Sequence, residues 1–169
     1  MKGLFKAGLV AAVLILLLGC GKGDDVQAIR ELVDKGAGLG EKHDIGGLMK
    51  LAAEDFLALP GEVDRRSAKA ILWRAFQYYG AFKILYPLPK VTVEADGKKA
   101  SASLPFLVVR EEVSFPKLKD LTQDPKRWLE EVGENADLYA LDMELLKENG
   151  EWLVQRVLLR RFTGRSFKE

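Results

Sequence analysis

Residues 136–162, ADLYALDMELLKENGEWLVQRVLLRRF, form the stretch that decides the fold. From Tyr139 to Leu145 every second residue is large and apolar, which is the period-two pattern of a strand with one face on a core. Asn149-Gly150 is a strong turn signal because both residues tolerate positive φ. The apolar run from Trp152 supplies a second strand, so this stretch predicts an antiparallel hairpin. A hairpin alone is marginally stable in water, and the preceding chain must therefore cover or extend it.

The composition is that of a globular domain of ordinary size. The chain has 169 residues, of which 48% are apolar and 30% are charged, so it can build a core. Without Lys2 and Lys6, which belong to a segment that we expect to be removed, 26 basic residues become 24 against 25 acidic ones. This balance creates no basic field that would attract nucleic acid. One cysteine excludes an intrachain disulfide, and one histidine excludes the usual His/Cys zinc clusters.

The N-terminus carries a secretory pattern. Lys2 and Lys6 precede an apolar run from Ala7 to Leu18. A membrane span needs about 20 apolar residues, so this shorter run predicts the apolar region of a signal peptide over residues 1–19. The run ends in Leu17-Leu18-Gly19-Cys20, which resembles a bacterial lipobox. The alternative is a buried cysteine at the end of a signal anchor, which the short run disfavours.

The lipobox resemblance implies a lipoprotein. It implies cleavage after Gly19, a diacylglycerol thioether on Cys20, and usually N-acylation with a fatty acid such as palmitate. Two or three chains, at about 0.8 kcal/mol per buried CH₂, make such an anchor effectively permanent. An aspartate after the cysteine usually retains these proteins in the inner membrane, but Gly21 stands there. We therefore expect a protein that faces the periplasm from the outer rather than the inner membrane.

The first helix of the mature chain is expected after a short tether, residues 20–25. Apolar residues recur at helical spacing from Val26 to Ala37. Gly36 and Gly40 share a face of this helix, although glycine costs up to about 1 kcal/mol relative to alanine in a helix. Either a close backbone approach or fraying explains them, and the sequence does not choose.

Two further helices are expected to begin at aspartate N-caps, Asp44 and Asp64. The later helix carries an apolar stripe made of Ala68, Ile71, Leu72, Ala75, Phe76 and Tyr79. Trp73 flanks that stripe. The functional interpretation of this aromatic face, including Trp73 and Tyr79, is a wall of a ligand pocket. Packing against a sheet is the simpler interpretation, and we favour it.

The strands before the final hairpin are interrupted. A short strand is expected at residues 55–57, and a longer one at residues 82–95 that is bent or broken by its two prolines. Asp96-Gly97 is a hairpin turn into a strand over residues 99–113. Within that strand Pro105 argues for an edge position or a bulge, where its missing N–H does no harm.

An insertion at residues 114–135 separates this strand from the final hairpin. Asp124-Pro125 predicts a helix start. Trp128, Leu129 and Val132 then form a short apolar face. One short helix cannot bury that face alone, so it must cover the sheet, close a pocket as a lid, or meet a partner.

The order of elements, helices first and antiparallel strands after, indicates an α+β fold. At this level the chain resembles the nuclear transport factor 2-like superfamily. The residues that carry the resemblance are Ile29-Arg30-Glu31-Leu32-Val33, Asp44 through Leu48 to Asp55-Phe56, and Ala136-Asp137-Leu138-Tyr139 through Gly150-Glu151-Trp152. The resemblance implies a cone in which a strongly bent, mostly antiparallel sheet wraps around N-terminal helices. The single domain is expected at residues 26–163, with the insertion at 114–135 and a basic tail at 164–169.

The sequence contains no phosphate loop, paired metal ligands, nucleophile elbow or redox motif, so no cofactor or metal is expected. The resemblance implies that an enzyme of this superfamily, such as a ketosteroid isomerase or polyketide cyclase, would use acids and aromatics inside the cone. Candidates by residue type are His43, Tyr78, Tyr79, Tyr139, Asp142 and Glu144. None falls in a motif that can be matched residue by residue.

His43 is most simply a surface or capping residue. Asp142 and Glu144 alternate with Tyr139 and Met143, which predicts that they face solvent.

The one local charge cluster lies at the C-terminus. It consists of Arg156, Arg160, Arg161, Arg165 and Lys168. Such a cluster can touch phosphate-bearing headgroups or an anionic envelope polymer, at about 1 kcal/mol for each near-surface charge. The simpler interpretation is a solvated strand end, which we favour.

The sequence leads to three functional hypotheses. The first is a non-enzymatic, lipid-anchored periplasmic domain that binds a small apolar ligand or another envelope protein, with Trp73, Tyr79, Trp128 and Met143 as pocket or lid residues. The second is a small cone-pocket isomerase or cyclase, with His43, Tyr139 and Asp142 as its candidate catalytic residues. The third is a scaffold without a functional pocket. An acid with a raised pKa that faces the cone interior beside an aromatic hydroxyl would distinguish the second hypothesis.

Overall fold

The computed structural model describes residues 22–110 and 136–161. The predicted lipobox with Cys20, the 114–135 insertion with Trp128, and the basic tail at 164–169 lie outside these residues.

The predicted hairpin is confirmed. Strand β6 (Ala136–Glu148) pairs antiparallel with β7 (Glu151–Arg161). The turn between them holds Asn149 at φ 51° and Gly150 at φ 87°. Both angles lie in the left-handed region that asparagine and glycine tolerate best, and consecutive positive φ values match the twist of a two-residue hairpin.

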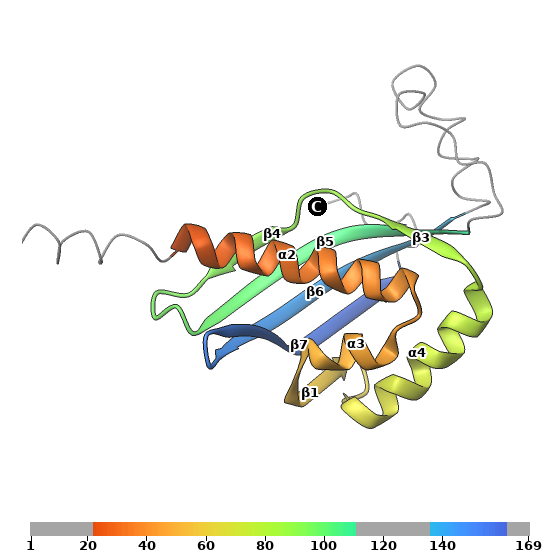
Figure 1. Cartoon of the computed structure of the whole chain (residues 1–169), viewed down its shortest axis with the longest axis horizontal. Helices are drawn as coiled ribbons and strands as arrows, with labels where there is room; N and C mark the ends of the chain where they lie inside the picture. The colour runs from red at the N-terminus through yellow and green to blue at the C-terminus, as the bar shows by residue number, and fades with distance from the viewer. Residues whose placement is uncertain (1–21, 111–135, 162–169) are drawn as a thin grey trace, which may run out of the picture.

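The hairpin lies at the centre of a seven-stranded sheet with the order β2-β1-β7-β6-β5-β3, and β4 also pairs with β5. The remaining strands are β1 (Ala52–Leu59), β2 (Val63–Asp64), β3 (Phe82–Leu85), β4 (Lys90–Val93) and β5 (Lys99–Arg110). All pairs are antiparallel except β1 with β7, which run parallel. The sheet curls strongly around the helices, as the predicted α+β cone requires (Figure 1).

Two details of the sheet differ from expectation. Strand β1 is longer than the expected 55–57, because pairing with β7 extends it from Ala52, opposite Val154, to Leu59, opposite Leu158. Pro105 was predicted to mark an edge position or a bulge, yet β5 is a central strand that pairs with β6 throughout this region. On its other side, however, β5 pairs with β4 up to residue 103 and with β3 from residue 107. Pro105 therefore lies in a gap between two partner strands, where one side of β5 is locally an edge.

Three helices lie within the described residues: α2 (Lys22–Glu41), α3 (Ile45–Lys50) and α4 (Arg65–Tyr79). Figure 1 shows α2 running across one face of the sheet. Both predicted N-caps are confirmed. Asp44 accepts a hydrogen bond from the Gly47 backbone N–H at 2.8 Å, and Asp64 accepts one from Ser67 at 2.7 Å. The carboxylates thus satisfy N–H groups that have no partner within the helix.

Helix α2 begins at Lys22, so most of the expected tether is helical. Asp25, in the first turn of α2, is 9% exposed. Its carboxylate accepts hydrogen bonds from Lys147 Nζ at 2.5 Å and Trp152 Nε1 at 3.0 Å. These bonds attach the first turn of α2 to the final hairpin.

The two glycines that share a face of α2 differ in the space around them. The helix continues to Glu41, so fraying does not account for Gly36 and Gly40. An added Cβ would lie 3.3 Å from Ile84 Cδ1 at Gly40 and 3.7 Å from Leu51 Cδ1 at Gly36. The close approach is made by neighbouring side chains, and it is tight at Gly40.

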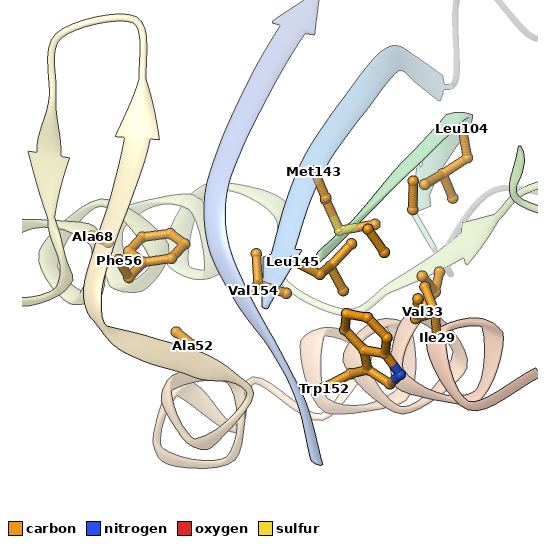
Figure 2. Packing of buried hydrophobic residues seen from close by; sticks show 12 residues of the cluster. Ile29, Val33, Ala52, Phe56, Ala68, Leu104, Met143, Leu145, Trp152 and Val154 are labelled. Atoms are coloured by element: carbon orange, nitrogen blue, oxygen red, sulfur yellow. The ribbon is translucent and has the colours of Figure 1, made fainter. Parts of the chain in front are cut away.

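The main core lies between α2 and the sheet. Trp152 is 6% exposed and belongs to the same buried cluster as Ile29 and Val33 of α2 (Figure 2). The final strand thus packs against α2 through Trp152. The apolar stripe predicted for α4 is partly wrong. Ala68 and Phe76 are buried, but Ile71 is 48% exposed because it faces a surface groove.

Candidate functional site

An apolar cavity of about 280 Å³ lies inside the cone. Helix α2 contributes one wall, in which Leu32, Val33 and Gly36 take part. Central strands β5 and β6 contribute the opposite wall, with Leu104 and Met143 among its residues. The helices and the curled sheet thus line the space that the cone fold predicts.

The lining of this cavity is almost free of polar groups. No acidic residue, histidine, lysine or arginine from the described part of the chain lines it, and Tyr86 is the one lining residue with a polar side chain. The Tyr86 hydroxyl donates to Asp34 Oδ1 at 2.5 Å. Burial and the neighbouring Asp34 carboxylate raise the pKa of Tyr86 to about 12, so its hydroxyl is neutral at physiological pH. The cavity is therefore suited to apolar contact.

A second, polar site lies at the end of the hairpin away from its turn. Tyr79 of α4 donates its hydroxyl proton to Asp137 Oδ2 at 2.7 Å, and its oxygen lies 2.6 Å from the Tyr139 hydroxyl. Arg161 pairs with the other oxygen of Asp137. Burial, followed by these hydrogen bonds, raises the pKa of Tyr79 well above its usual value, so the hydroxyl remains protonated. Because the one O–H of Tyr79 donates to Asp137, the Tyr79 oxygen accepts a hydrogen bond from the hydroxyl of Tyr139.

These residues form part of the wall of a groove of about 580 Å³. Helix α4 contributes much of the remaining wall through Ile71, Arg74 and Tyr78. The groove shares no lining residue with the apolar cavity. The two sites touch through one stacked pair, Phe106 of the cavity and Tyr139 of the groove, whose ring centroids lie 5.4 Å apart.

The residues predicted from the sequence to line a pocket do not all lie in one site. Met143 lines the apolar cavity, whereas Tyr79 lines the polar groove. Trp73 is 58% exposed and lines neither site, because it projects from the opposite side of α4 to the groove. Cys20 and Trp128 lie outside the described residues.

The catalytic candidates do not converge. Tyr139 lies in the polar groove. His43 is exposed at φ 56° between α2 and α3, and its ring stacks on Phe76 with centroids 4.8 Å apart. Asp142 lies on the other face of the sheet and pairs with Arg160. Glu144 there pairs with Arg156, so both acids face outward as the alternation predicted.

Sequence reasoning missed three residues that define these sites. Asp137 joins the groove because it lies two residues before Tyr139 on one strand face, a signal that the alternation already contained. Tyr86 gave no local signal, and the signal at Gly36, a glycine inside a helix, did not indicate a cavity, since the positions of both against the cavity depend on the curl of the sheet.

The described residues contain neither a cluster of metal ligands nor a helix suited to span a membrane. Within 22–110 and 136–161, no three acidic, histidine or cysteine side chains gather as metal ligands would. None of the helices there is long and apolar enough to cross a membrane.

No protein-family model matches the chain, and no curated protein matches it. Solved structures do. A Nostoc punctiforme protein of unknown function with a cystatin-like fold has a TM-score of 0.65 at 11% identity, covering 85% of this chain and 96% of its own. A Novosphingobium aromaticivorans protein described as nuclear transport factor 2-like, with a cystatin-like fold, has a TM-score of 0.60 at 20% identity, covering 93% and 90%.

Bd1075 of Bdellovibrio bacteriovorus has a TM-score of 0.59 at 14% identity, over 82% of this chain. The match spans only 41% of the length of Bd1075. At such low identities these similarities establish the fold alone. The chain has a nuclear transport factor 2-like, cystatin-like cone fold.

Proposed function

We propose that this protein is a lipid-anchored domain of the bacterial cell envelope, attached through Cys20, that binds a small apolar molecule in the cavity of its cone. The observation that supports ligand binding is the cavity of about 280 Å³ with an apolar lining. An engineered apolar cavity of about 150 Å³ binds benzene, so this cavity has room for a neutral molecule about twice that size. Well-packed cores rarely leave such a space.

The lining selects against charge. A carboxylate or ammonium group placed there would lose its hydration without gaining an ionic partner, at a cost of several kcal/mol. The proposal is therefore a binding function. An isomerase or cyclase would need an acid against the substrate, and the described lining offers only the neutral hydroxyl of Tyr86.

Gly36 supports a binding role for the cavity. It lies within α2, where glycine destabilises a helix by about 1 kcal/mol relative to alanine, and it lines the cavity. An added Cβ at Gly36 would meet only ordinary contact, 3.7 Å from Leu51, so packing alone does not demand a glycine there. A larger residue would instead reduce the space for a ligand.

Naphthalene, a neutral bicyclic probe, tests this function. The purified protein is expected to bind it saturably, with a rise in thermal stability. Gly36→Leu should abolish binding because the added side chain occupies the cavity. The matched control is Gly38→Leu, two residues along the same helix, where an added Cβ has no atom within 4 Å. Absence of naphthalene binding by the wild type, or equal binding by both variants, would contradict the proposal.

The anchor is tested separately. Cys20→Ala is expected to abolish incorporation of labelled palmitate and to leave an uncleaved precursor in the membrane fraction. Unchanged electrophoretic mobility together with retained acyl label would show that Cys20 is not the lipidated residue. This result would leave the cavity experiment unaffected.

A further inference from the structure

The polar groove at the open end of the hairpin carries an excess of positive charge. Arg161 is neutralised by Asp137. Arg74 lines the groove, and within the described residues its one hydrogen bond is from Nε to the backbone oxygen of Ala70 at 3.3 Å. Arg110 likewise has no carboxylate partner in the described part of the chain. Within the described residues, the guanidinium groups of Arg74 and Arg110 therefore have no carboxylate partner, and of these two Arg74 lines the groove.

Aromatic rings accompany these charges. The guanidinium carbon of Arg110 lies 5.2 Å from the ring centroid of Tyr78 and 6.0 Å from that of Tyr79. Tyr78 is 68% exposed and packs edge-on against Tyr79, with centroids 5.0 Å apart. Together with Ile71, which is 48% exposed, these rings give the groove an apolar surface that water now covers.

Two of the three tyrosine hydroxyl groups in the groove take part in hydrogen bonds. Tyr79 donates to Asp137, and Tyr139 lies within hydrogen-bond distance of Tyr79. Asp137 also accepts from Arg161. An incoming anion would meet the guanidinium group of Arg74 in the groove and that of Arg110 over the rings of Tyr78 and Tyr79, whereas Arg161 offsets the charge of the Asp137 carboxylate.

We propose that this groove is a second binding site, separate from the cone cavity, for a planar aromatic carboxylate. The planar body would lie against Tyr78 and Ile71. Its carboxylate would take hydrogen bonds from the guanidinium groups of Arg74 and Arg110, which match carboxylate geometry in a bidentate manner. The site does not depend on the function proposed for the cavity, since the two share no lining residue.

The test measures the affinity of the purified full chain for 2-naphthoate by calorimetric titration. This compound is naphthalene, the probe chosen for the cavity, with a carboxylate group added. Arg74→Ala and Arg110→Ala are each expected to weaken binding about tenfold, because each removes a charge-assisted hydrogen bond. Affinity should also fall as ionic strength rises. The matched control is Arg66→Ala, an exposed arginine on the same helix that does not line the groove.

Two comparisons assign the binding to the groove. Gly36→Leu, which fills the cavity, should leave 2-naphthoate affinity unchanged while it abolishes naphthalene binding. Conversely, Arg74→Ala should leave naphthalene binding unchanged. The proposal is overturned if the wild type does not bind 2-naphthoate, if Gly36→Leu abolishes that binding, or if Arg66→Ala weakens it as much as Arg74→Ala.

Discussion

The two ends of the final hairpin carry the same chemistry in different surroundings. At the turn end, Lys147 and Trp152 form a cross-strand pair, and both donate to the carboxylate of Asp25. At the other end, Tyr139 and Arg161 form a cross-strand pair beside the carboxylate of Asp137. Each end thus combines a cation, an aromatic ring and an acid.

Solvent exposure distinguishes the two groups. At the turn end the side chains of Asp25 and Lys147 are 12% and 30% exposed. At the other end the side chains of Asp137 and Arg161 are 21% and 70% exposed, and a groove lies beside them. A buried, satisfied group contributes to stability and is costly to break, whereas a partly exposed one leaves surface for a ligand. We infer that the turn end holds α2 on the sheet and that the other end is free to bind.

The largest effect is expected from Trp152→Ala. It empties a site that is 6% exposed and removes one donor from Asp25, so the free energy of unfolding should fall by about 3–5 kcal/mol. Urea denaturation measures the change. The matched control is Trp73→Ala, since Trp73 is 58% exposed and should cost less than about 0.5 kcal/mol. Similar losses for both tryptophans would contradict the structural role assigned to the turn end.

A smaller loss, about 2 kcal/mol at neutral pH, is expected for Asp25→Asn, which leaves Lys147 without its ionic partner. The hydrogen bond from Lys147 lowers the pKa of Asp25 in the folded protein. A lowered folded-state pKa gives stability that is complete above the unfolded value, about 3.9, and is lost as pH falls through the folded value. The difference between wild type and variant should therefore shrink below about pH 4.

Asp24→Asn is the control for this measurement. Asp24 lies in the same helical turn but is exposed, so its loss removes only a favourable interaction with the helix dipole, about 0.3–1 kcal/mol. Unfolding is followed by urea titration at several pH values. A difference between wild type and Asp25→Asn that stays constant down to pH 2 would show that the carboxylate is not held by Lys147.

These two ends also show which parts of the fold the sequence reveals. The hairpin, both aspartate caps and the proline break between β3 and β4 were predicted, because each depends on the conformational preference of a few adjacent residues. The parallel pairing of β1 with β7 was not, since it joins Ala52 to Val154 and leaves no local pattern. Asp25 illustrates the same limit. Its position at the start of a helix does not reveal its partners, which lie 122 and 127 residues away.

The sites were less predictable than the fold. Met143 was expected at a pocket because it is an inward-facing residue of a central strand, and inward direction follows from alternation. The cavity itself is a property of all its walls together, including the missing side chain at Gly36. The groove needed the curl of the sheet to bring Tyr79 from α4 to Asp137, which is 58 residues away.

The smallest effect is expected from Tyr79→Phe at the exposed end. The substitution keeps the ring, whose centroid lies 5.9 Å from that of Phe82, and removes only the hydroxyl. Asp137 keeps Arg161 as a partner, so the loss should be that of ordinary hydrogen bonds, about 1 kcal/mol. Because the pKa of Tyr79 is raised above its usual value near 10, the loss should not vary between about pH 6 and 9.

The neighbouring Tyr78→Phe is the matched control, since Tyr78 is 68% exposed and its hydroxyl makes no hydrogen bond within the described residues. If Tyr79→Phe destabilised the protein more than Asp25→Asn in parallel urea titrations, the exposed end would hold the fold together as firmly as the buried end. Exposure would then not separate the structural role from the binding role.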